Sequence, residues 1–171
     1  MITAVELRLP LQSQLRDEAL RACPCECCGL IEGIVEAQTA RVVALHPTTN
    51  LAAEPDRFEI DPAQHIALLR KLRGTERSII GCYHSHPNGR AEPSERDRES
   101  ASEPDFLWLI CAANESIQTC SIAAFVSGGP YFSPVPILHK LPGNAGLRPT
   151  AGEDARDPGK GSLDRRGARL I

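Results

Sequence analysis

Residues 84–97 combine two histidines, a serine and a carboxylate in a pattern suited to binding a metal ion. His84 and His86 are two apart, and on a strand such side chains project from the same face, so both imidazoles can aim at one point. Asp97 lies one turn into the helix expected to start at Ser94, from which its carboxylate can return to the histidines. Two histidines and one carboxylate leave a fourth tetrahedral position for water, as in catalytic zinc sites.

Each half of this pattern also has a simpler explanation. A histidine pair on a strand can be exposed or hydrogen-bonded locally. Ser94 and Asp97 also form a variant of the capping box, in which Asp97 would only serve the helix N-terminus. The metal site is favoured because both halves occur together, with Pro87 and Ser94 at fixed offsets.

The elements that must position these residues follow from the hydrophobic periodicity. A first helix is expected over 11–22. A second, capped by Asp61 and starting at Pro62, has its apolar face formed by Ile66, Leu68, Leu69 and Leu72. A third runs from Ser94 to about Ser102. Strands are expected over 27–33, 40–45, 58–60, 77–84, 106–112, 119–126 and 131–138. This alternation predicts an α/β fold: a central mixed sheet flanked by helices.

The spacing of the site residues resembles that of the JAMM (MPN-type) zinc metalloproteases. Their motif is His-x-His-Pro, six residues, then Ser-x-x-Asp, and the chain carries it without a gap from His84 to Asp97. The family also has an upstream Pro-x-Glu-x-Cys-Gly segment that opens a strand, which here is residues 24–29.

Further features look like the prokaryotic members of this family. They are Asn50 and the segment 58–62, and the resemblance covers roughly residues 1–138. It implies a cytidine-deaminase-like MPN/JAMM fold, in which the domain would span residues 1–140.

The resemblance implies a role for each site residue. One zinc ion per chain would be held by His84, His86 and Asp97. Glu26 would accept a proton from the zinc-bound water, and Ser94 would donate its hydroxyl to the developing oxyanion. The alternatives are that Glu26 is a solvated loop charge and that Ser94 is a plain helix cap. The nearby Glu32 and Glu36 have no motif support.

The resemblance also implies a class of substrate. Family members cleave peptide or isopeptide bonds at the C-terminus of ubiquitin-like proteins, and the short loop after His86 resembles the compact bacterial branch, some of which process ubiquitin-like sulfur carriers. The alternative function is a non-catalytic MPN-type scaffold, although scaffold members generally lack the metal ligands. The sequence is compatible with a homodimer. The net charge of −3 gives no support to a DNA-associated role as in RadC-like relatives.

Four cysteines in six residues form a second candidate site, at positions 23, 25, 27 and 28. They could hold another metal ion, but side chains alternate along an extended strand, so they cannot easily face one ion. We favour the interpretation that Cys27 or Cys28 is a core residue, with thiol reactivity at Cys23 or Cys25 as an alternative. A zinc-deaminase site is rejected because the chain has no His-x-Glu sequence.

The overall composition sets the remaining limits. The chain has 171 residues, a hydrophobic fraction of 42%, a formal net charge of −3 and a pI near 6.0. These values fit one globular domain that binds neither nucleic acid nor membrane. The lack of a signal-peptide pattern leads us to expect a cytoplasmic protein. Residues 141–171 contain no aromatic residue, so we expect a disordered C-terminal tail.

Overall fold

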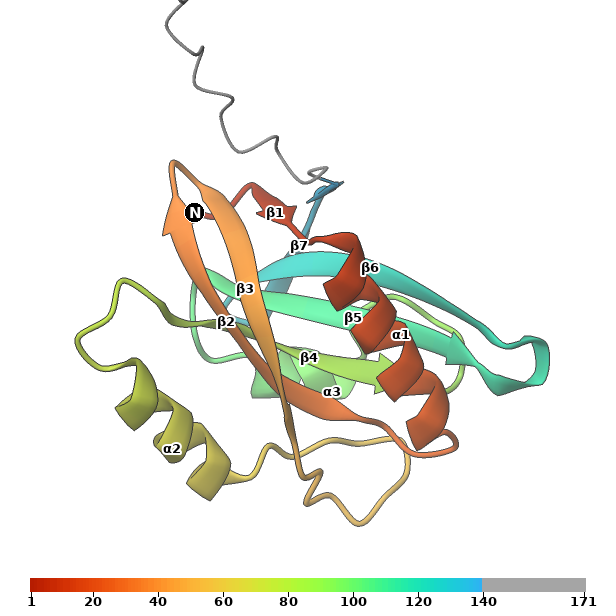
Figure 1. Cartoon of the computed structure of the whole chain (residues 1–171). Coiled ribbons are helices and arrows are strands. Elements are labelled where there is room, and N and C mark those ends of the chain that lie inside the picture. Colours follow the sequence, from red (N-terminus) through yellow and green to blue (C-terminus); the bar gives the residue numbers. More distant parts are fainter. Residues whose placement is uncertain (140–171) are drawn as a thin grey trace, which may run out of the picture. The chain divides into compact units, whose positions relative to one another are not determined.

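The computed structural model describes residues 1–139. In this part of the chain eight strands form one mixed sheet, with helices against it (Figure 1). The strands are β1 (Ala4–Glu6), β2 (Cys28–Glu36), β3 (Thr39–Thr48), β4 (Ser78–His86), β5 (Phe106–Asn114), β6 (Thr119–Gly128), β7 (Tyr131–Val135) and β8 (Ile137–Leu138). The helices are α1 (Leu9–Ala22), α2 (Pro62–Leu72), α3 (Glu95–Ser100) and the 3-10 helix η1 (Glu115–Ile117). The expected fold class is confirmed, and the expected tail lies outside the described residues.

The sheet has the strand order β7-β6-β5-β4-β2-β3-β1-β8. β4 runs parallel to β5, and β1 runs parallel to both β3 and β8, while the other pairs are antiparallel. β4 is therefore a central strand that is paired along both sides. The candidate metal ligands His84 and His86 lie at its C-terminal end.

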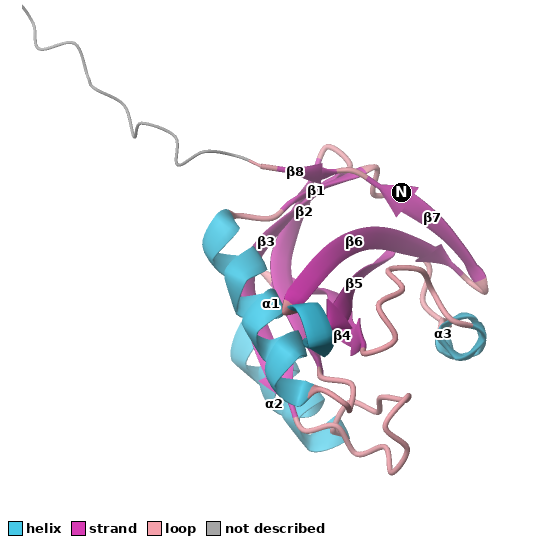
Figure 2. Cartoon of the chain, turned by 90° about the vertical axis from the view of Figure 1, so that its right-hand side faces the viewer, coloured by secondary structure: helices cyan, strands magenta, loops and turns pink. Residues whose placement is uncertain are grey.

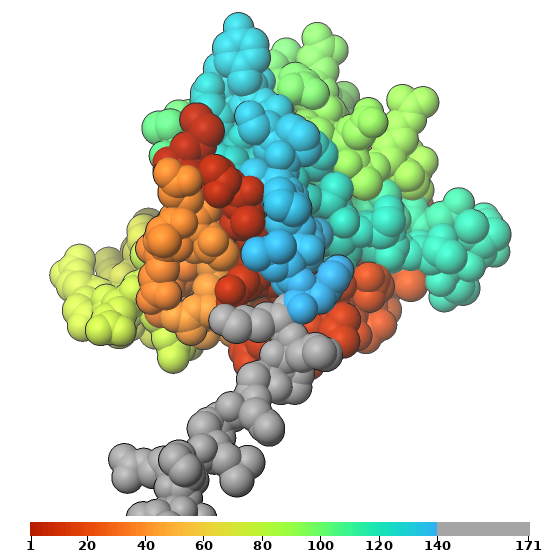
Figure 3. Space-filling view, turned by 90° about the horizontal axis from the view of Figure 1, so that it is seen from above, coloured from red at the N-terminus to blue at the C-terminus, as the bar shows by residue number. Residues whose placement is uncertain are grey.

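The expected single strand over 131–138 is in fact two strands at opposite ends of the strand order. β7 pairs with β6 and β8 pairs with β1, and Pro136 separates them. The sheet curves strongly, so that one short run of chain reaches both ends (Figure 2). Figure 3 shows this last run beside the first residues of the chain. The expectation was wrong because the chain changes its pairing partner from β6 to β1 where the sheet curves. The hydrophobic periodicity of a single strand carries no information about this curvature.

The two faces of the sheet bury alternate residues of each strand. Ile31 of β2 and Tyr83 of β4 are fully buried in the cluster that packs against α1. Their neighbours Leu30 and Cys82 point to the opposite face, where α2 and α3 lie. Figure 1 shows α1 in front of the sheet and α3 behind it. His84 follows Cys82 by two residues, so the candidate site is on the face opposite α1.

Helix α2 starts as expected but buries a narrower face. Asp61 caps it by accepting a hydrogen bond from the amide of Ala63 at 2.8 Å. Leu68 and Leu72 are buried against the sheet, whereas Ile66 and Leu69 are 47% and 51% exposed, so the predicted four-residue apolar face is wrong for these two. None of the helices within residues 1–139 is long and apolar enough to cross a membrane.

Glu32 is a buried carboxylate that belongs to the packing of the sheet. It lies on β2 and accepts hydrogen bonds from His46 Nε2 at 2.8 Å and from Arg77 Nη1 at 2.9 Å. Burial alone would raise its pKa, but the bonds from Arg77 and His46 outweigh burial and lower the pKa below 4.5. Glu32 is therefore a charged structural residue.

We expect Glu32→Gln to lower the free energy of unfolding by about 1.5–3 kcal/mol, since charge-assisted bonds to a buried group are lost. A lowered folded-state pKa stabilises the native state above the unfolded-state value, so the loss should be full above pH 4.5 and should shrink as the pH falls further. Urea unfolding at several pH values measures this difference. The control is Glu36→Gln, which removes only a surface ion pair with Arg41. Equal effects of the two substitutions would contradict the prediction.

Candidate metal site

The three candidate ligands come from two elements and meet at one buried point. His84 and His86 end β4, and Asp97 lies in the first turn of α3; these side chains are at most 5% exposed. His84 Nε2 is 2.9 Å from His86 Nε2, and the two nitrogens lie 3.3 and 3.4 Å from the oxygens of Asp97. Within residues 1–139, no other group of histidine, cysteine or acidic residues converges in this way.

The geometry of this group suits a small cation. Zinc bound tetrahedrally at about 2.0–2.2 Å would keep its ligand atoms about 3.3–3.6 Å apart, close to the separations from each nitrogen to Asp97. The other ring nitrogen of His86 is 2.8 Å from the backbone oxygen of Arg90. In the neutral form of His86, donation to that oxygen places the proton on Nδ1 and leaves the Nε2 lone pair free for a metal ion. The residues present therefore fit a zinc ion.

The protonation states of His84 and Asp97 are also those that metal binding requires. Burial lowers the pKa of His84, so its imidazole is neutral at pH 7. Burial alone would raise the pKa of Asp97, but hydrogen bonds from His84 and His86 outweigh burial and lower the pKa far below its usual value. Neutral imidazole and charged carboxylate are the forms that coordinate metals.

Two aromatic side chains surround His84, and neither was assigned to the site from the sequence. Phe58 stacks on its ring at a centroid distance of 4.3 Å, and Trp108 meets it edge-on at 5.9 Å. His84 Nδ1 is buried and has no hydrogen-bond partner among the described residues. His84 is thus held by ring packing where His86 is held by a hydrogen bond. Phe58 comes from the loop before α2, which no local pattern relates to β4.

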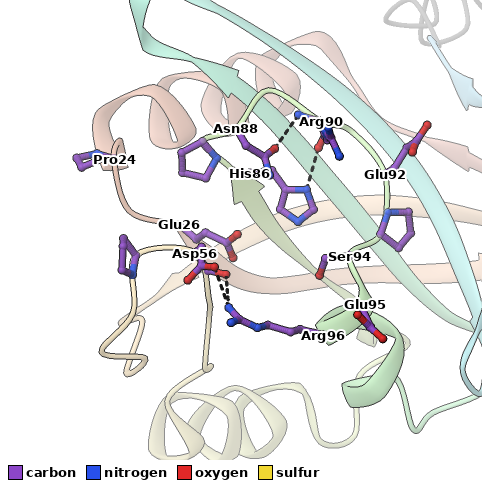
Figure 4. Close-up of a pocket in the computed structure, with 13 residues that line it drawn as sticks. Pro24, Glu26, Asp56, His86, Asn88, Arg90, Glu92, Ser94, Glu95 and Arg96 are labelled. Atoms are coloured by element: carbon purple, nitrogen blue, oxygen red, sulfur yellow. Dashed lines mark hydrogen bonds and ion pairs between the residues drawn. The ribbon is translucent and has the colours of Figure 1, made fainter.

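Glu26 lies in the segment between α1 and β2 and faces the candidate ligands. It is 7% exposed and lines a cavity together with His86 and Ser94, and Figure 4 shows the three side chains around this space. Burial raises the pKa of Glu26 to about 7, the positive charge of His86 opposes this, and the negative charge of Asp97 adds to it. A carboxyl with a pKa near neutrality can both accept and release a proton at pH 7.

Two cavities at the site have an ion pair in their shared lining. One has a volume of about 660 Å³ and the other about 460 Å³, and both are lined by Glu26, Asp56, Ser94 and Arg96. Arg96 Nη1 donates to Asp56 Oδ2 at 2.9 Å, which links α3 to the loop before α2 (Figure 4). We call these two cavities the cleft; its walls are α3 and the loop before α2, and the contact between Arg96 and Asp56 joins them.

A comparison with known protein families identifies the chain at this point. The family described as prokaryotic homologs of the JAB domain matches residues 8–123, which include both halves of the candidate site. The chain belongs to this family. The resemblance seen in the sequence is thereby confirmed.

Individual members of the JAB-type group agree with this assignment. The desampylase of Haloferax volcanii is 38% identical over 110 residues, which are 64% of this chain and 78% of the relative. A probable TtuB-protein conjugate cleaving protease of Thermus thermophilus is 38% identical over 97 residues, 53% of this chain and 59% of the relative. The solution structure of protein DSY2949 from Desulfitobacterium hafniense superposes with a TM-score of 0.70 and 26% identity, covering 80% of this chain and 92% of that one.

Ser94 serves as the N-cap of α3 in this JAB-type structure. Its hydroxyl accepts a hydrogen bond from the amide of Asp97 at 3.1 Å and donates to Asp97 Oδ2 at 2.7 Å. The Asp97 carboxylate in turn accepts from the Ser94 amide at 2.6 Å, which completes a capping box. The structure therefore shows the capping role that the sequence offered as an alternative. It also shows that capping brings Asp97 to the histidines.

The four cysteines of residues 23–28 do not form a second metal site in the described chain. Cys27 and Cys28 are buried, as expected for core residues, whereas Cys25 is exposed and Cys23 is half-buried. Burial raises the pKa of Cys27 to about 12, so its thiol stays protonated. The four side chains point to different surroundings, and they do not converge on a common point.

Proposed function

We propose that the chain is a zinc-dependent hydrolase that cleaves a peptide or isopeptide bond at the C-terminus of a ubiquitin-like or sulfur-carrier protein. The observation that carries this proposal is the convergence of His84, His86 and Asp97 beside the buried Glu26. One of the two relatives is named as a probable protease that cleaves TtuB-protein conjugates, and the other as a desampylase.

We assign each site residue one role in the hydrolysis. Zinc held by His84, His86 and Asp97 would lower the pKa of water to about 7 and polarise the substrate carbonyl. Glu26 takes the proton of the attacking water and passes it to the leaving amine. Ser94 donates its hydroxyl to the oxygen of the carbonyl under attack, because rotation about Cβ–Oγ can redirect the proton that now points at Asp97.

The burial of the site favours a substrate whose chain is narrow next to the bond that is cleaved. His84, His86, Asp97 and Glu26 are each at most 7% exposed, so a carbonyl group reaches them only on an unbranched stretch of chain. A C-terminal Gly-Gly segment meets this requirement, because glycine has no side chain to clash with the walls.

The alternative function is a scaffold that binds partners without catalysis. The complete ligand set disfavours it, since a scaffold has no need to bury two histidines, an aspartate and a glutamate together. Burial of such polar groups costs free energy unless they are paired or bind a metal.

The test is hydrolysis of a ubiquitin-like carrier that ends in Gly-Gly and is joined to a small amine or a lysine side chain. We expect the zinc-loaded protein to release the amine by cutting directly after Gly-Gly, as measured by mass spectrometry. A chelator should abolish cleavage and added zinc should restore it. The control substrate has Val-Gly in place of Gly-Gly and should resist cleavage. If no carrier in a broad panel is cut, the enzyme proposal fails and the scaffold stands.

A further inference from the structure

Asn50 connects the loop before α2 to the segment that carries Glu26. It follows β3 and forms an isolated antiparallel bridge with Ile60, which closes residues 50–60 into a loop. This loop supplies Phe58, which stacks on His84, and Asp56, which pairs with Arg96. The loop is therefore one wall of the cleft.

The Asn50 carboxamide uses its full hydrogen-bonding capacity. Its nitrogen donates to the backbone oxygens of Glu26 and Arg57, each at 2.9 Å. Its oxygen accepts from the amides of Ala52 and Glu59, each at 3.0 Å. Two donors and two acceptor sites are all that an asparagine amide offers. Three of these hydrogen bonds lie within the loop, and the fourth reaches out of the loop to Glu26.

The backbone of Glu26 is held on both sides by this same loop. Its carbonyl accepts from Asn50, and its amide donates to the backbone oxygen of Pro55 at 3.0 Å. The next amide, that of Cys27, donates to Ser85 Oγ at 2.8 Å, and Ser85 lies between the two histidines. Within the described residues, no hydrogen bond restrains the Glu26 carboxylate itself. Its position over the ligands is therefore set by the backbone.

We propose that Asn50 is a positioning residue for the reaction: it holds the backbone of Glu26 so that the carboxylate faces the ligands His84, His86 and Asp97. This inference rests on the proposed function, in which Glu26 moves the proton. Asn50 itself touches neither the ligands nor the reacting atoms. Its effect is on the rate of proton transfer, because a displacement of about 1 Å of a catalytic group can cost 10²-fold in rate.

The test compares Asn50→Asp with the wild type. Aspartate keeps an oxygen for the amides of Ala52 and Glu59 but replaces the donor to Glu26 and Arg57 by an oxygen. The link to Glu26 is therefore lost, while the two bonds from Ala52 and Glu59 still hold the loop. We expect kcat to fall by about 10–100-fold while KM stays within about threefold, since the cleft walls are kept. Asn50→Ala should show at least the same loss of kcat.

The matched control is Gln64→Ala. Gln64 is also an amide side chain and makes two hydrogen bonds to Thr49, the neighbour of Asn50, but none to Glu26. We expect kcat, KM and zinc content close to those of the wild type. An equal loss of kcat in Gln64→Ala would overturn the proposal, since any loosening of this segment would then suffice.

A second readout does not depend on activity. We expect the Glu26 amide, which donates to Pro55, to exchange hydrogen faster in Asn50→Asp than in wild type or Gln64→Ala, with unchanged zinc content. Unchanged exchange, or unchanged kcat in an active enzyme, would overturn the positioning role. If the wild type cuts no conjugate but exchange rises in Asn50→Asp alone, the structural link stands and the proposed function fails instead.

Discussion

Glu26→Gln should lower kcat by about 100-fold or more, because the substitution keeps the shape of the side chain but removes the base. Zinc content, the melting temperature and binding of the conjugate should stay close to wild type, since the ligands and the cleft walls are unchanged. The measurement is amine release from the Gly-Gly conjugate, with zinc determined by elemental analysis on the same sample.

The control for this prediction is Glu32→Gln. Glu32 is also a buried glutamate, six residues further along the chain, but its carboxylate accepts hydrogen bonds from His46 and Arg77 and lines neither cavity of the site. We expect this variant to lose stability and to keep kcat at a temperature where it is folded. Full activity in Glu26→Gln would remove Glu26 from the mechanism.

His86→Ala should remove most of the zinc, whereas the wild type should hold about one ion per chain. The substitution deletes one of three protein ligands, and the two that remain cannot complete a tetrahedral site. Hydrolysis should fall with the zinc content. Elemental analysis after dialysis against a weak chelator gives the stoichiometry.

Two further variants make this result specific. His65→Ala removes a histidine of α2 outside the ligand group and should leave the zinc content unchanged. The double variant His84→Ala/His86→Ala should be free of zinc. If it kept a full equivalent, the metal would have to lie elsewhere, and the four cysteines of residues 23–28 would be the first candidates.

The convergence of His84, His86 and Asp97 could be predicted from the sequence because the three residues are local. His84, His86 and Asp97 lie within one short stretch, and the strand, loop and helix that carry them are each signalled by their own residues. Glu26 lies far upstream, and only the resemblance to a family suggested its role. The structure adds that Glu26 and His86 line one cavity.

The contacts made by the loop before α2 could not be predicted in this way. Phe58 reaches His84 and Asn50 reaches Glu26 only after β2, β3 and β4 have paired, and neither contact follows a helical or strand period. The prediction of the buried face of α2 was wrong for a related reason. Periodicity marks an apolar face, but the sheet contacts only Leu68 and Leu72 of it.

The pairing of β1 with β8 has a consequence for the order in which the protein can form during synthesis. Among the strands of residues 1–139, β1 is made first and β8 last, so the second side of β1 can pair only after Ile137 has been added. By contrast, β4 lies between β2 and β5, so both of its partners exist once Asn114 has been added. β4, which carries the two histidines, can thus be paired on both sides while one edge of β1 is still unpaired.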